Sequence, residues 1–501
     1  MTGRRSTRVL AALALMGAAL AGATPAHASD GGERRAVIVS AANLEVAARA
    51  VVSVGGTVDR SLTVIGAVAA HVSAAGIAAL STNPHVLVTA DAVLHPTSGS
   101  FDASVLDPQV AAIDPGPSWS PDAGRGVGVA LVDTGVADTP DLHGARLVRS
   151  PDFSGEGDAV DHYGHGTFMA GLIAGDGTAS AAAPTRHFGA APGATLISVK
   201  VARADGSSTL SRVIAGIGWV VANRDTYNIG VINLSFGLDA PLPYLLNPLD
   251  AASEVAWSAG ITVVASAGNG GERGVTSPGD DPYVITVGAI DTMGTAATND
   301  DTAPKWSGRE RVVGQDKPDV LAPGVSVVSL RAPGSTIDVE HPEGRVDGTY
   351  FRGSGTSMST AVVSGAVAVL LSHHGNATPD DVKGAIVDGA TPVGRRARAL
   401  DLDAADHAVA SSSWWQRFPI AFDAADRGPQ TGMPWTATRW TDTTWAASRW
   451  TASRWTASRW TASRWTASRW TTLDWSASRW TASRWTASRW TADMWVSQSW
   501  G

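Results

Sequence analysis

The sequence contains no cysteine among its 501 residues. Without cysteine the chain can form neither a disulfide framework nor a thiolate metal site, and it has no cysteine nucleophile. Its hydrophobic content of 44%, together with many Ala, Gly and Val residues, is ordinary for an α/β globular protein. A chain of this length can bury a large core and has room for more than one folding unit.

The charge of the chain is negative and unevenly distributed. The formal net charge is −8, but residues 435–501 contain nine Arg and three Asp, so this tail carries +6 and the rest of the chain −14. An acidic body with a basic tail argues against nucleic-acid binding by the body and indicates a separate task for the tail. We therefore expect no nucleic-acid partner.

The first residues have the features of a cleaved secretory signal. Arg4-Arg5 precedes an apolar run from about residue 9 to 23, and Ala26-His27-Ala28 fits a small-residue cleavage site. A membrane anchor is the alternative, but the run is short and rich in alanine, and a spanning helix needs about 20 apolar residues. We expect residues 1–28 to be a signal peptide and the protein to be secreted.

Residues 29–100 have a pattern of their own. Apolar periodicity predicts strands and helices in turn: 36–40, 44–52, 58–72 (as short strands), 74–80 and 86–88. The order strand-helix-strand-strand-helix-strand is that of a small α+β, ferredoxin-like unit. Because this unit lies between a signal and a larger domain and has no catalytic candidates, we interpret it as a pro-segment.

From residue 101 to about 410, apolar strands alternate with helices. The expected strands are 127–132, 194–201, 230–234, 261–265, 284–287, a short one at 320 and 325–330, and the expected helices include 210–222 and 249–259. Strands that are apolar throughout are typical of parallel sheets covered on both faces. We therefore predict a doubly wound, mainly parallel α/β sheet.

Reactive polar residues lie at the ends of these elements. Asp133 follows the first strand, His165 precedes an apolar helix, and Ser357 lies in the stretch Gly353–Gly365 before another helix. Taken singly, Ser357 could be a helix N-cap and His165 part of a turn. Together they supply a weak nucleophile, the base that it needs and a group to orient the base. Asn269, on a glycine-rich loop after a strand, could donate to an oxyanion.

Four ordered motifs resemble those of the subtilisin-like serine proteases, the subtilases. They are VALVDTGV at 129–136, HGTFMAG at 165–171, ASAGNG at 265–270 and GTSMS at 355–359. The similarity extends from about residue 35 to 408, because the first unit resembles the inhibitory, chaperone-like propeptide of this family. The resemblance implies that Ser357 is the nucleophile and His165 the general base, which Asp133 orients. It also implies that Asn269 and the Ser357 backbone N–H hold the oxyanion.

The resemblance further implies where a peptide substrate binds. Ser235, Phe236 and Gly237 match the strand edge that pairs with substrate backbone and borders the first specificity pocket. Ala267-Gly268 would form the other wall, and Thr276 falls near the pocket floor. No acidic residue clearly occupies this floor, which disfavours strict specificity for basic side chains. Asp280 and Asp281 are close enough in sequence to keep that specificity open.

The chain departs from the family pattern in two places. Ala361 replaces the proline that usually follows the serine motif, which changes the helix geometry slightly and removes no catalytic group. The stretch from about Asp291 to Tyr350 is longer than in a minimal member and has surface-loop character. The implied chemistry requires no cofactor. Subtilases often bind structural calcium, but the sequence has no diagnostic ligand spacing, so calcium stays undecided.

After a linker at residues 411–434, tryptophan recurs every fifth residue from Trp435 to Trp500, mostly as Thr-Ala-Ser-Arg-Trp. A period of five puts the rings neither on one strand face nor on a single helical stripe. A stacked solenoid and a disordered tail are both compatible with this repeat. Arg beside Trp suits an anionic envelope polymer or a membrane surface, and a low-complexity spacer is the alternative.

Two other functions fit parts of the sequence. Asp133-Thr134-Gly135 also matches the aspartic protease triplet, but that chemistry needs a second carboxylate and leaves His165 and Ser357 unused. The second is a binding protein, in which the tail is functional and the subtilase-like body inactive. We predict instead a secreted serine endopeptidase that acts on proteins or peptides. In this prediction its own propeptide is an intramolecular inhibitor, and removal of the propeptide activates the enzyme.

Overall fold

The computed structural model describes residues 34–83, 85–96, 110–113, 116, 119–183, 186–238, 244–295, 298–394, 397–409 and 416. The predicted signal peptide (1–28), the repeat tail (435–501) and the linker (411–434) apart from Gln416 lie outside the described residues, as do residues 97–109. The described residues after Arg34 belong to a single unit by their mutual contacts.

A small α+β unit comes first. Its elements are β1 (Arg34–Ser40), α2 (Leu44–Ser53), β2 (Thr57–Leu62), β3 (Ala67–Ser73), α3 (Ala74–Ser81) and β4 (Leu87–Ala90). The strands form one sheet in the order β2-β3-β1-β4. Each helix starts at a polar cap, because Asn43 accepts a hydrogen bond from the N–H of Val46 and Ser73 one from that of Gly76. The order of elements is the predicted one.

The larger domain is built on a nine-stranded sheet in the order β19-β20-β16-β13-β12-β10-β6-β8-β7. In chain order the strands are β6 (Gly128–Asp133), β7 (Leu147–Arg149), β8 (Thr195–Lys200), β10 (Ile229–Leu234), β12 (Thr262–Ser266), β13 (Ile285–Ile290), β16 (Val320–Pro323), β19 (Thr391–Val393) and β20 (Ala397–Ala399). All neighbouring pairs are parallel except β19 and β20. The predicted mainly parallel α/β architecture is therefore confirmed.

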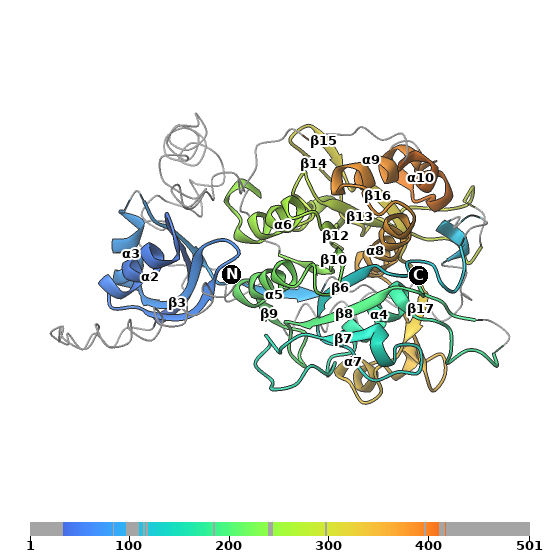
Figure 1. Ribbon diagram of the computed structural model, residues 1–501, viewed down its shortest axis with the longest axis horizontal. Helices are drawn as coiled ribbons and strands as arrows, with labels where there is room; N and C mark the ends of the chain where they lie inside the picture. Colours follow the sequence, from blue (N-terminus) through green and yellow to red (C-terminus); the bar gives the residue numbers. More distant parts are fainter. Residues whose placement is uncertain are drawn as a thin grey trace, which may run out of the picture. The chain divides into compact units, whose positions relative to one another are not determined.

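Helices cover both faces of this sheet (Figure 1). On one side lie α5 (Leu210–Ala222) and α6 (Pro248–Ser258), and on the other α4 (His165–Ala174) and α8 (Thr356–His373). Two further helices, α9 (Pro379–Gly389) and α10 (Leu402–Val409), pack against each other near α8. Every residue of α8 from Thr356 to Leu370 is buried. This helix is long and apolar enough to cross a membrane, but 83% of it is buried inside the domain, which explains its composition.

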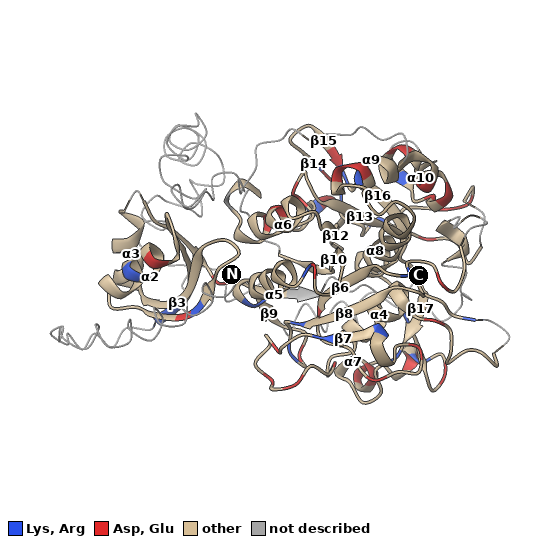
Figure 2. Cartoon of the chain, in the orientation of Figure 1, with Lys and Arg blue, Asp and Glu red and all other residues tan. Residues whose placement is uncertain are grey.

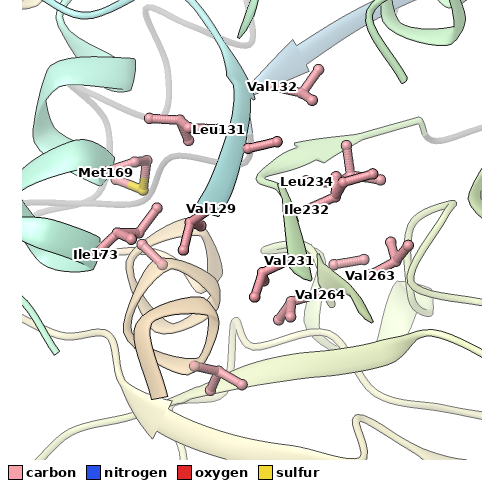
Figure 3. Close-up of a cluster of buried hydrophobic side chains, with 14 of the residues drawn as sticks. Val129, Leu131, Val132, Met169, Ile173, Val231, Ile232, Leu234, Val263 and Val264 are labelled. Atoms are coloured by element: carbon pink, nitrogen blue, oxygen red, sulfur yellow. The ribbon is translucent and has the colours of Figure 1, made fainter. Parts of the chain in front are cut away.

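The core between α4 and the sheet shows why the strands are apolar on both faces. Figure 3 shows Met169 and Ile173 of α4 beside Val129 and Leu131 of β6. Val132, the next residue of the strand, points to the opposite face. Because helices cover both faces of the sheet, the residues of β6 that point to one face and those that point to the other are all buried. This packing holds the carboxyl end of β6 in a fixed place.

Three small sheets complete the described part. They are β11-β5-β9 (Phe236–Gly237, Val93–Pro96 and Ser208–Thr209), β14-β15 (Glu310–Val312 and Gln315–Lys317) and β17-β18 (Val327–Leu330 and Tyr350–Gly353). The segment predicted as a strand at 325–330 pairs antiparallel with β18 and does not join the main sheet. The cause is the chain reversal through residues 331–349, which contain α7 (Thr336–Glu340). The stretch 291–350 is thus partly regular structure and not simply a surface loop.

Candidate active site

Three neighbouring strands end at the same edge of the main sheet. Val132 of β6 lies beside Leu234 of β10, which lies beside Ala265 of β12. The residues that follow are Asp133, Ser235 and Ser266, and Asn269 stands three residues further on. Open α/β sheets form their sites at such carboxyl ends. Register therefore brings these segments, far apart in sequence, to one place.

Asp133 and His165 form a buried pair at this edge. His165 Nδ1 lies 2.8 Å from Asp133 Oδ1 and 3.0 Å from Oδ2, and the side chains are 1% and 0% exposed. The Nδ1–H therefore donates to the carboxylate, which fixes the imidazole orientation and leaves Nε2 to act as acceptor. Among the described residues, Nε2 has no hydrogen-bond partner. Asp133 is thus engaged by a histidine, which an aspartic protease dyad would not provide.

Ser357 is the second residue of α8. Its side chain is buried, and its Oγ donates to the carbonyl oxygen of Ser235 at 3.3 Å. The serine hydroxyl thus lies over the end of β10, the strand next to β6 and Asp133. The N-terminus of an 18-residue helix presents backbone N–H groups and a positive dipole end at this position.

Asn269 contacts the residue before the serine. Its Oδ1 accepts hydrogen bonds from the N–H and the hydroxyl of Thr356, both at 3.0 Å. With Oδ1 occupied in this way, the amide orientation is set and Nδ2 is the donor end of the side chain. Asn269 and the start of α8 are therefore held together as one unit.

The residues predicted to bind substrate are also brought together. Ser235 is followed directly by β11, which consists of Phe236 and Gly237, and Leu238 forms a bridge with Ser277. The Thr276 N–H donates to the carbonyl of Ala267 at 3.2 Å. Gly268 has φ +81°, and a Cβ there would lie 2.7 Å from the Thr276 side chain, so this close approach requires glycine.

Buried carboxylates lie behind this pocket region. Asp250 of α6 accepts from the Ser277 hydroxyl at 2.9 Å, and Asp281 accepts from the Tyr283 N–H at 2.7 Å. Burial raises the pKa of both, that of Asp281 to about 6. The Asp281 carboxylate is therefore bound by the backbone of its own loop. The Asp250 carboxylate contacts the hydroxyl of Ser277, the residue after Thr276. Figure 2 shows the acidic residues of α6 and, separately, those of α10.

No group of three or more His, Asp or Glu side chains in the described ranges is placed to hold a metal ion. One oxygen-rich loop resembles such a site in its donors. There the carbonyls of residues 282–284 and the carboxylate of Asp319 surround the ammonium groups of Lys317 and Lys383. These two cations balance the negative charge of the surrounding oxygens.

Two features of the site were missed by the sequence reasoning. Asp161, which lies just outside the histidine motif at 165–171, is buried and accepts hydrogen bonds from residues around Asp133 and His165. Its position four residues before the histidine was the available signal. The second is β5, which lies between β9 and β11. The alternation of apolar and polar residues in β5 is weak, and its partner strands are more than 100 residues away in the sequence.

Comparisons with known proteins show the family of the chain. A sequence profile described as the subtilase family matches residues 124–411. Over 275 residues the chain is 42% identical to serine protease AprX of Bacillus subtilis. The aligned region covers 53% of this chain and 61% of AprX. It is 32% identical to subtilisin E of Bacillus subtilis over 349 residues, covering 68% of this chain and 79% of the relative.

Among solved structures, the chain resembles fervidolysin from Fervidobacterium pennivorans, described as a keratinolytic enzyme related to subtilisin. The TM-score is 0.56 at 23% identity, covering 76% of this chain and 62% of that one. This likeness supports the fold. The chain thus spans less than two thirds of AprX and of fervidolysin. The profile match, the identity to subtilisin E and the fold together show that the chain belongs to the subtilase family of subtilisin-like serine endopeptidases.

Proposed function

We propose that this protein is a secreted serine endopeptidase that uses Ser357, His165 and Asp133 as its catalytic residues. The observation that carries this proposal is the buried Asp133–His165 pair, which lies at the same sheet edge as the Ser357 hydroxyl. The pair leaves the acceptor nitrogen of the imidazole available for the proton of a nucleophile. An inactive body would not need to keep this arrangement.

In the proposed reaction, Ser357 Oγ attacks the carbonyl carbon of the scissile peptide bond while His165 Nε2 takes the hydroxyl proton. The tetrahedral intermediate then collapses, the C–N bond breaks, and the leaving amine takes the proton from His165. A water molecule attacks the acyl carbon while His165 takes its proton. The bond from that carbon to Ser357 Oγ then breaks, Oγ takes the proton back from His165, and the carboxylic acid product leaves. Asp133 keeps the imidazole oriented and stabilises its protonated form.

The negative charge that forms on the carbonyl oxygen needs donors already in place. We assign this role to Asn269 Nδ2 and the Ser357 backbone N–H. The support is the pair of hydrogen bonds from Thr356 to Asn269 Oδ1, which orient the amide beside the start of α8. This chemistry requires no cofactor.

Residues 29–100 are proposed to be an inhibitory propeptide. The last strand of this region, β5, pairs antiparallel with β11, where Gly237 lies opposite His95, and with β9, where Ser208 lies opposite Leu94. A peptide that adds a strand between two edges is bound as a substrate would be. Ser235, Phe236 and Gly237 with Ala267, Gly268 and Thr276 would then contact substrate. Maturation would cut the chain somewhere in about residues 95–110.

The ends of the chain are assigned from sequence alone. We propose that residues 1–28 direct secretion and that the Trp/Arg tail binds an anionic envelope polymer or a membrane surface. Structural calcium is not required by the proposed mechanism.

The test is the intact mass of the secreted wild type beside Ser357→Ala. We expect the wild type to lose residues up to about 100 and the variant to keep them. Wild type should also react covalently with a serine-directed fluorophosphonate, and Ser357→Ala should not. Equal processing of both proteins together with no labelling of wild type would refute the proposal and favour an inactive body that serves the tail.

A further inference from the structure

We propose that Asp161 is a positioning residue that holds Asp133 and His165 in their mutual geometry. This inference rests on the proposed function, because the geometry in question is that of the catalytic pair. In the described part of the chain, Asp161 makes no hydrogen bond to the imidazole of His165 or to the carboxylate of Asp133. It acts through the backbone N–H and hydroxyl groups beside them.

Asp161 accepts five hydrogen bonds on one carboxylate that is 4% exposed. Its Oδ1 accepts from the Thr134 hydroxyl at 2.8 Å, the Gly164 N–H at 2.7 Å and the Tyr163 N–H at 3.1 Å. Its Oδ2 accepts from the N–H and the hydroxyl of Thr167 at 2.8 and 2.6 Å. The carboxylate therefore gathers donors from both sides of His165 and from the loop that follows β6.

Thr134 connects this carboxylate to the catalytic pair. Its N–H donates to Asp133 Oδ1 at 2.8 Å, and its hydroxyl, which donates to Asp161, also accepts from the Gly166 N–H at 2.8 Å. Gly166 follows His165 directly. One hydroxyl thus ties the residue after the aspartate to the residue after the histidine, and Asp161 fixes the direction of that hydroxyl.

Close packing makes the arrangement rigid. A Cβ on Gly166 would lie 2.1 Å from the carbonyl oxygen of Gly135, and a Cβ on Gly135 would lie 2.9 Å from that of Val160. Lys200 is fully buried and lies opposite Asp133 in the pairing of β8 with β6. Its ammonium group donates to the same Val160 carbonyl. The segment that carries Asp161 is therefore held against the Asp133 loop from two directions.

The geometry predicts a specific loss when the carboxylate is changed. In Asp161→Asn one oxygen becomes an NH₂ group, which cannot accept and must face backbone N–H donors. Unpaired buried donors should shift the loop or α4 by up to about 1 Å. Misplacement of about 1 Å at a reacting group costs roughly 10²-fold in rate. The loss should therefore appear in kcat and not in KM.

The experiment uses the full chain and measures three quantities. The first is the first-order rate of self-cleavage, in which the substrate is already bound, so that KM plays no part. The second is kcat and KM on a chromogenic peptide after maturation. The third is the pH profile of kcat/KM. The variants are Asp161→Asn, Thr134→Val and Thr134→Ser. The matched control is Asp141→Asn. The Asp141 carboxylate is also buried and accepts hydrogen bonds from the N–H groups of Gly177 and Ala179, which are not part of the catalytic pair.

We expect Asp161→Asn to lower kcat about 100-fold with KM within about threefold and to displace the acid limb of the pH profile. Thr134→Val should show a smaller loss of the same kind, and Thr134→Ser, which keeps the hydroxyl, should be close to wild type. Asp141→Asn should lose thermal stability while kcat and the pH profile stay unchanged.

The inference is overturned if Asp161→Asn and Asp141→Asn lose stability alike and both keep the wild-type kcat and pH profile. If Asp161→Asn does not fold, the Thr134 pair decides: equal kcat for the valine and serine variants would overturn it. NMR titration of the His165 imidazole in the Ser357→Ala background gives a readout without turnover. An unchanged titration there would also count against Asp161. A wild type without self-cleavage or fluorophosphonate labelling would instead refute the proposed function.

Discussion

At the scale of single residues, buried carboxylates in this chain fall into two kinds. Asp161 and Asp338 receive several donors each, and the Arg331 and Arg345 guanidinium groups hold the pKa of Asp338 far below its ordinary value against the opposing effect of burial. Asp281 is different. It is fully buried, and its Oδ2 has no hydrogen-bond partner in the described part of the chain.

The ionisation of Asp281 should therefore oppose folding at neutral pH. Burial raises its pKa from 3.8 to about 6, although Lys317 and Lys383 act in the other direction. Between these two pH values the folded protein keeps a proton that the unfolded chain has lost, so the free energy of unfolding falls as pH rises from about 4 to 6. Asp281→Asn removes this loss and should be more stable than wild type above pH 6, by at most about 3 kcal/mol.

The measurement is denaturant unfolding at pH 2 to 8 in a Ser357→Ala background, which prevents autolysis. The range extends below pH 4 because the contribution of Asp319 to the free energy of unfolding changes only there. The control is Asp319→Asn. Burial would raise the pKa of Asp319, but Lys317 and Lys383 lower it below the ordinary value. The contribution of the ionised Asp319 to the free energy of unfolding should therefore be lost as pH falls. The two variants should show opposite pH slopes relative to wild type. Parallel slopes would contradict the assignment of these pKa shifts.

At the scale of elements, β5 is the connection between the small α+β unit and the larger domain. It completes the three-stranded sheet with β9 and β11. Asp91, just before β5, accepts from both the N–H and the hydroxyl of Ser211 in the first turn of α5. Successive residues of β5 differ sharply, since Leu94 is fully buried and Val93 is 53% exposed. This alternation gives a matched pair of substitutions on one strand.

Leu94→Asp should weaken the hold of the small unit on the domain, because it removes a buried side chain worth about 2 kcal/mol and introduces a charge. After cleavage, the lag before peptidase activity appears should shorten at least about 30-fold. Val93→Asp should leave the lag within about twofold of wild type. The lag is measured with a chromogenic peptide added to freshly secreted protein. Equal lags for the two variants would show that β5 does not inhibit the enzyme through its pairing with β9 and β11.

At the scale of the whole molecule, the described part of the chain neutralises buried oxygens with its own cations. The Lys383 ammonium donates to the carbonyls of Pro282, Tyr283 and Val284 at 2.6, 3.2 and 2.9 Å. Lys317 donates to Asp319 at 2.7 Å. Burial lowers the pKa of Lys383 to about 7, while Asp319 opposes this effect. Lys383 links α9 to the residues just before β13 and β16.

Removal of free metal ions should therefore have little effect on stability. We expect EDTA to change the Tm by less than about 2 °C. Lys383→Met, which leaves buried carbonyls and Asp319 without that cation, should cost about 3–5 kcal/mol and lower the Tm by about 10 °C. Exposed Lys305→Met is the control and should be neutral. A large loss of Tm in EDTA, reversed by calcium, would show that the fold depends on a bound ion.

Much of the architecture could be predicted from local pattern. Helix α5 occupies the range expected from periodicity, and the strands around Asp133 and Asn269 were placed within one residue of their ends. Apolar runs and caps are local properties, so they can be read without knowing the partners of a segment. Strand 325–330 was assigned to the wrong sheet, because a short apolar run does not reveal which edge it pairs with.

The sequence by itself determined the α/β class, the absence of thiol chemistry and the four ordered motifs, because composition, periodicity and motif residues are properties of the chain alone. The tertiary structure decided the rest. It placed Asp161 against Thr134, β5 between β9 and β11, and Lys383 against Asp319. Each of these contacts joins residues 27 to more than 100 positions apart, and only the packing of helices on a registered sheet brings such residues together.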